Sequence, residues 1–138
     1  MRGETPGWAF GDAWFATALA VLDRPAALAE ILAAADAINH AIPTEDEIVH
    51  AVQLLDGCGL LDLMHDGRLR LTASGRALLE RRTGGLVGQT GSVERLLRKI
   101  PPTPSAARPS AQSLATAYAA YAADAVAAQG SNERPRRR

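Results

Sequence analysis

Apolar residues recur at helical spacing along the first part of the chain, and they predict two packed helices. Residues 13–22 are apolar almost throughout, so we expect this helix to be central to the packing, with Asp12 as its N-terminal cap. A second helix is predicted over residues 26–38, where apolar residues follow Leu28 at helical intervals. Both helices are therefore expected to contribute to one core.

The next stretch, residues 45–56, carries strong helix signals. The Thr44 side chain is placed to cap the first turn, and Glu47 stands where a carboxylate reaches back to the Thr44 N–H. Gly57 and Gly59 are expected to end the helix, since glycine adopts the left-handed conformation at little cost. The pattern predicts a third helix that turns its apolar face to the core.

Residues 61–71 predict a β-hairpin. The Asp66-Gly67 pair stands between two runs of alternating apolar and polar residues, which is a strong hairpin signal. Because side chains alternate along a strand, the leucines of both runs face inward and Arg68 and Arg70 face outward.

The remaining residues predict further helices, separated by glycine-rich and proline-rich segments. A fourth helix is expected over 76–82, and a short one over 93–100 with Ser92 as its cap. The last predicted helix carries one narrow apolar seam, formed by Leu114, Tyr118, Tyr121 and Ala125. We divide the chain into a domain over 12–82, a joint and short helix over 83–100, a proline-rich linker over 101–110, an alanine-rich helix over 111–129 and a basic tail over 130–138 that we expect to be disordered.

Length and composition narrow the class of protein. A chain of 138 residues is long enough for one domain with a hydrophobic core, and its single cysteine excludes an intramolecular disulfide. No apolar run approaches the roughly 20 residues that a membrane span needs. Residues 13–22 could imitate the core of a secretion signal, but Glu4 and Asp12 precede them and a positive leading segment is missing. We therefore expect a cytoplasmic protein with no membrane partner.

The formal net charge of zero hides an uneven distribution. Residues 1–62 carry ten acidic residues and two basic ones, whereas residues 63–100 carry three acidic residues and eight basic ones. Residues 101–138 carry two acidic residues and five basic ones. This asymmetry indicates either an anionic partner or head-to-tail self-association.

The order of elements over residues 12–82 resembles a winged helix-turn-helix domain, with the segment LTASGRALL at 71–79 similar to the exit from the wing in bacterial winged-helix regulators. The resemblance implies a mostly α fold with a small β-hairpin wing and a trailing C-terminal helix. It also implies a small DNA-binding transcriptional regulator whose third helix lies in the major groove of double-stranded DNA while the wing touches the backbone.

The sequence departs from that family at the third helix, which has no lysine or arginine and opens with three acidic residues. Phosphates supply most of the affinity for DNA, so such a helix binds the backbone poorly. On the DNA interpretation, the wing and the fourth helix hold the phosphates and Gln53 pairs with adenine. The candidate DNA-binding residues are Thr44, His50, Gln53, Arg68, Arg70, Arg76, Arg81 and Arg82.

Other interpretations follow from the same residues. A non-catalytic adaptor would reuse the winged-helix fold and bind a protein through its acidic third helix. The seam of the last helix could form a homodimer or could fold back onto the first helix, and the sequence leaves both open. Scattered histidines and one cysteine give no metal-ligand spacing, and no catalytic constellation or phosphate-binding loop is evident, so we expect no metal, no cofactor and no enzyme activity.

Overall fold

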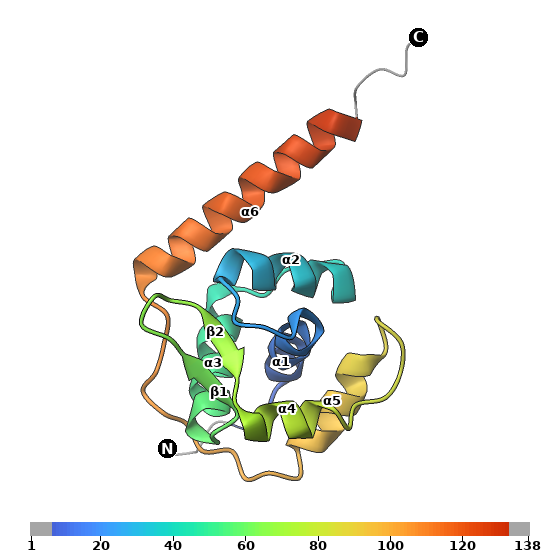
Figure 1. Ribbon diagram of the computed structural model, residues 1–138, viewed down its shortest axis with the longest axis vertical. Coiled ribbons are helices and arrows are strands. Elements are labelled where there is room, and N and C mark those ends of the chain that lie inside the picture. Colours follow the sequence, from blue (N-terminus) through green and yellow to red (C-terminus); the bar gives the residue numbers. More distant parts are fainter. Residues whose placement is uncertain (1–6, 133–138) are drawn as a thin grey trace.

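The computed structural model of the protein describes residues 7–132, and within that range all side chains except those of residues 125 and 128–132. The described part is mostly helical, as predicted, with one small antiparallel sheet (Figure 1). In chain order the elements are α1 (Phe10–Leu22), α2 (Leu28–Asn39), α3 (Glu45–Gly57), β1 (Leu61–Leu63), β2 (Leu69–Leu71), α4 (Ala73–Leu79), α5 (Gln89–Leu97) and α6 (Ala111–Asn132).

Helix α1 lies at the centre of the core, and α2, α3 and α5 all pack against it. Its residues from Gly11 to Leu19 are buried, which confirms the central role predicted from its apolar sequence. The predicted start and cap were wrong, because the helix begins at Phe10 and Asp12 lies inside its first turn. There the Asp12 carboxylate accepts a hydrogen bond of 2.7 Å from the Ala9 N–H.

Helix α2 begins two residues later than predicted because Ala26 is held by the hairpin. The backbone N–H of Ala26 donates to the Leu69 carbonyl at 2.9 Å, and the Leu69 N–H donates back at 2.8 Å. This pair of hydrogen bonds ties the turn between α1 and α2 to the outer edge of strand β2.

Helix α3 and its cap are as predicted. The Glu47 N–H donates to the Thr44 hydroxyl at 3.1 Å, and the Thr44 N–H donates to the Glu47 carboxylate at 2.8 Å. The helix ends at Gly57, and Gly59 adopts the left-handed conformation with a φ of 75°. The reciprocal cap fixes where α3 starts, and this sets which of its residues face outward.

The hairpin is confirmed, with Leu61 opposite Leu71 and Leu63 opposite Leu69. Its turn is a three-residue loop that ends at Gly67, whose φ of 89° suits glycine. Three of the four leucines are buried and Leu63 is partly buried, whereas Arg68 and Arg70 are exposed. The alternation therefore predicted the correct face for each strand.

The two helices after the hairpin differ from their predicted bounds. Helix α4 starts at Ala73, because the Thr72 hydroxyl caps it by accepting from the Gly75 N–H at 3.0 Å. Helix α5 starts at Gln89, so Ser92 lies inside it and is no cap. The Ser92 hydroxyl is buried and accepts from the Thr83 N–H at 2.9 Å, closing the glycine-rich joint onto α5.

Helix α6 leaves the proline-rich linker near the hairpin and crosses α2 (Figure 1). Its C-terminal half then extends beyond the rest of the fold. Because α6 continues to Asn132, the first three residues of the predicted disordered tail are helical. The other tail residues, 133–138, lie outside the described residues.

Candidate binding surfaces of the third helix and the wing

The exposed residues on the outward side of α3 are acidic. Glu45 and Asp46, in its first turn, are exposed, and Thr44 before them is exposed as well. Acidic residues in a first turn complement the helix dipole, so this arrangement stabilises the helix. The same residues leave a negative surface at the end of α3 that lies near α6.

The C-terminal half of α3 is covered by the linker. The Ser105 N–H donates to the Gln53 carbonyl at 2.9 Å, and the Cys58 thiol donates to the Pro101 carbonyl at 3.5 Å. At Gly57 the two backbones approach so closely that an added Cβ would lie 1.8 Å from the Thr103 carbonyl oxygen. The linker therefore occupies part of the side that a DNA-reading helix would present to a groove.

The linker is also fixed at its start. The Trp8 indole N–H donates to the Ile100 carbonyl at 2.7 Å, so the N-terminal segment holds the end of the α5 region in place. Trp8 thereby anchors the segment before α1.

The DNA interpretation assumes that the His50 side chain points outward from α3. In the structure this side chain is instead paired with a residue of α1. Its Nδ1 lies 2.6 Å from Oδ1 of Asp12, whose side chain is only 1% exposed. Burial raises the pKa of the Asp12 carboxyl, while the hydrogen bond with His50 opposes that rise. His50 therefore pairs with a buried acid of α1 and ties the two helices together.

Each arginine of the hairpin has an aspartate partner. Arg68 Nε lies 2.8 Å from the carboxylate of Asp66, and Arg70 Nε lies 3.4 Å from that of Asp62. All four side chains are about half exposed, so these pairs contribute little to stability. They nevertheless lower the positive charge that the hairpin would offer to a phosphate.

Arg70 and Arg76 share one surface hollow between β2 and α4. Its volume is about 540 Å³, and its lining also includes Asp62 and Glu80. A smaller neighbouring hollow of about 110 Å³ brings Arg24 and Asp23 to the same two arginines. This surface is therefore mixed in charge, with three acids and three bases.

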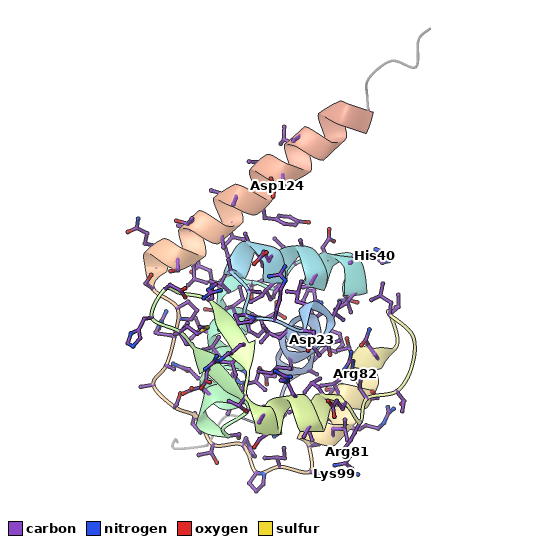
Figure 2. The ribbon with its side chains drawn as sticks, in the orientation of Figure 1. Asp23, His40, Arg81, Arg82, Lys99 and Asp124 are labelled. Atoms are coloured by element: carbon purple, nitrogen blue, oxygen red, sulfur yellow. The ribbon has the colours of Figure 1, made fainter. Side chains whose placement is uncertain are left out.

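Arg81 and Arg82 follow the end of α4, whereas the sequence placed both inside the fourth helix. Figure 2 shows both at this corner of the molecule, with Lys99 nearby in the view. Arg82 Nε donates to the Gln89 side chain at 2.6 Å, and its Nη1 donates to the Leu79 carbonyl at 2.8 Å. Arg82 thus joins α4 to α5, while Arg81 is exposed.

The seam of α6 packs within its own chain, and against α2 instead of α1. Leu114 is 1% exposed, and the Tyr118 hydroxyl donates to the Pro43 carbonyl at 2.5 Å. The Tyr121 hydroxyl donates to the Asp36 carboxylate at 2.7 Å. These three residues are therefore not free to form a dimer, and the side chain of Ala125 lies outside the described ones.

The described residues contain neither a group that could bind a metal nor a helix that could cross a membrane. Between residues 7 and 132, no group of three or more histidine, cysteine, aspartate or glutamate side chains is placed to hold a metal ion. None of the helices in this range is both long enough and apolar enough to cross a membrane.

Comparison of the chain with family models, with curated proteins and with solved structures gave no match.

Two features of the surface were missed by sequence reasoning. The glycine at position 57 suggested only a helix end, although a glycine within a helix also permits the close approach of another backbone. The sequence predicts a cap at Asp12, and no local signal links this residue to His50, which is 38 residues away.

Proposed function

We propose that the chain is a non-catalytic winged-helix adaptor that binds a protein partner. The observation that carries this proposal is the linker, which packs against the C-terminal half of α3, so that the two fully exposed residues of the helix, Glu45 and Asp46, lie in its acidic first turn. A helix in this state is poorly suited to a DNA groove, because it carries no lysine or arginine and the linker occupies part of its outer side.

The winged-helix interpretation of the fold is supported by three features. Three helices precede a hairpin, the order of elements matches over residues 12–82, and Ala26 pairs with the outer side of β2. The Thr44 cap fixes the start of α3 within this arrangement. On this interpretation the hairpin is the wing and α6 is the trailing helix.

The chemistry of the open surface indicates a basic partner. Glu45 and Asp46 are exposed, and Glu47 beside them is partly buried and engaged in the cap. Carboxylates at such a surface form charge-assisted hydrogen bonds with lysine or arginine side chains, most strongly with the forked guanidinium group. We therefore infer that the partner contributes a segment rich in arginine or lysine.

Selection from a displayed library of random peptides tests this proposal. We expect the full chain to enrich basic peptides. The double variant Glu45→Lys, Asp46→Lys should bind an enriched peptide at least about 10-fold more weakly, because two charge-assisted contacts are lost. The matched control is Arg70→Ala with Arg76→Ala, which should leave the affinity within about twofold. Circular dichroism verifies that each variant is folded.

Enrichment of peptides that are not basic would overturn the proposal. It would also fail if the two lysine substitutions left the affinity unchanged while the arginine substitutions reduced it.

DNA binding by the wing is the second candidate, and one observation favours it. Arg70 and Arg76 converge on one hollow, and Arg76 and Arg81 make no ion pair with any residue that the structure describes. These arginines could hold phosphates without any help from α3. The mixed charge of the hollow weakens this candidate, since Asp62 and Glu80 line it too.

A further inference from the structure

The loop that joins α4 to α5, residues 84–88, exposes two neighbouring aliphatic side chains. Leu86 is 49% exposed and Val87 is 62% exposed. Among the large apolar side chains that are exposed between residues 7 and 132, these are the only two that are adjacent in the chain. Isolated apolar residues are common on a protein surface, whereas an adjacent pair on one loop forms a small apolar patch that needs an explanation.

Hydrogen bonds at the base of this loop hold it in place. The Thr83 N–H donates to the Ser92 hydroxyl at 2.9 Å. Gln89, which is buried, donates twice to the loop: its backbone N–H to the Gly85 carbonyl at 3.0 Å and its side-chain amide to the Leu86 carbonyl at 3.0 Å. The loop is therefore closed by its own contacts, and it keeps both aliphatic side chains in water.

Positive charge surrounds the base of the loop. The Arg82 guanidinium is held there by the hydrogen bonds described above. Arg95 Nη1 lies 3.8 Å from the position of an added Cβ at Gly91, so this side chain reaches back along α5 toward the loop. Arg81 and Arg95 are exposed, and neither makes an ion pair with any residue that the structure describes. Residues 82–93 contain no acid.

The combination of an aliphatic tip and a basic base fits a lipid surface better than a protein or DNA. Specific protein interfaces bury about 800 Å² on each partner, and leucine and valine are under-represented among the residues that supply most of their binding energy. A DNA backbone would pair with the arginines, but it would leave the aliphatic side chains in water. A membrane surface takes up aliphatic side chains at the boundary of its acyl chains, and anionic head groups attract arginine.

We propose that residues 84–88 dock the protein on an anionic membrane surface, with Leu86 and Val87 in the boundary between head groups and acyl chains and Arg81 and Arg95 against the head groups. The sequence led us to expect no membrane partner, because no apolar run is long enough for a span. Contact with the surface of a membrane does not need such a run.

The docking loop goes beyond the adaptor proposal, because it uses a different part of the molecule. In Figure 1 the loop lies on the right, between α4 and α5, whereas α3 lies on the left. The acidic first turn of α3 therefore stays open to a basic partner while the loop contacts lipid.

Flotation of the purified full chain with lipid vesicles tests the proposal. We expect binding to phosphatidylcholine vesicles that contain about 30% phosphatidylserine, and little binding to phosphatidylcholine alone. The double variant Leu86→Gln, Val87→Gln should bind at least about 10-fold more weakly, because two aliphatic side chains no longer enter the membrane. The matched control is Val21→Gln, Val126→Gln, which replaces residues that are 41% and 68% exposed on other helices and should leave the affinity within about twofold.

The basic part of the surface is tested by a second pair of variants. Arg81→Gln, Arg95→Gln should weaken binding to the anionic vesicles at least about 10-fold and flatten its dependence on salt. Arg70→Ala, Arg76→Ala is the control, because these arginines line the hollow between β2 and α4, and it should leave the affinity within about twofold. Circular dichroism verifies that each variant is folded.

A polarity-sensitive fluorophore reports whether the tip enters the membrane. Attached to Leu86→Cys in a Cys58→Ser chain, it should shift its emission to shorter wavelength when the anionic vesicles are added. Attached to Val126→Cys in the same chain, it should not shift. Absence of binding to the anionic vesicles would overturn the proposal, and this is the result expected if the loop contacts DNA or a protein instead. Binding that Leu86→Gln, Val87→Gln leaves unchanged would overturn it as well.

Discussion

Replacing Gly57 with alanine is expected to lift the linker from α3 and to lower the free energy of unfolding by about 1–3 kcal/mol, as for overpacking of a close contact. The added methyl group would lie 1.8 Å from the Thr103 carbonyl oxygen, and no flexible side chain can give way there. Movement of the linker also removes the hydrogen bond from Ser105 to the Gln53 carbonyl. Without the linker, alanine would stabilise the helix by about 1 kcal/mol relative to glycine. The sign of the change in the free energy of unfolding therefore shows whether the linker lies against Gly57.

Two measurements check this expectation. Denaturant unfolding gives the change in stability, and limited proteolysis gives the rate of cleavage within residues 101–106, which should rise. Gly85→Ala is the matched control, because nothing lies within 4 Å of its added Cβ. A Gly57→Ala variant that is more stable than the parent and equally resistant in the linker would show that the linker does not cover α3.

Replacing His50 with leucine is expected to destabilise the fold by about 1–3 kcal/mol, because it leaves the buried carboxylate of Asp12 without its side-chain partner. Leucine fills a similar volume, so the loss reports on the contact more than on packing. His65→Leu is the control, since His65 is exposed in the wing loop, and its effect should stay within about 0.5 kcal/mol. Thermal or denaturant unfolding measures both.

The pH dependence of the His50→Leu variant tests the cause. Burial already raises the pKa of Asp12, and the hydrogen bond from His50 opposes this, so the variant should raise that pKa further. A native carboxyl with a raised pKa binds its proton more tightly than the unfolded one, so its contribution to stability is present in acid and is lost as pH rises through the native pKa. Adding Asp12→Asn to the His50→Leu variant should remove this loss of stability with rising pH. An unchanged pH profile would contradict the role given to the pair.

Local signals predicted the parts of the fold that depend on local physics. Thr44 and Glu47 fixed the start of α3, because a capping box is formed by residues three apart. Alternating leucines and the Asp66-Gly67 pair predicted the hairpin and its inward face. The prediction of Ser92 as a cap was wrong, because a serine that caps a helix and a serine with a buried hydroxyl look the same in the sequence. Only the fold places the Thr83 N–H beside the Ser92 hydroxyl.

The site depended on contacts between distant segments, which no local pattern encodes. Arg68 and Arg70 were predicted to face outward, and they do, but the pairing of Arg70 with Asp62 follows from the register of the hairpin. The seam of α6 was predicted as apolar, although the choice between packing in cis and a dimer needed the position of α2. The linker over α3 was missed because proline-rich segments signal extension and not what they lie against.

The most direct test of the claim that α3 does not read DNA is binding of the full chain to a random duplex library at low and at physiological salt. The account predicts that no motif is enriched at physiological salt, and that any binding at low salt is lost in the Arg70→Ala, Arg76→Ala variant. Enrichment of a motif at both salts, with the preference altered by Gln53→Ala, would contradict the account and restore α3 as a recognition helix.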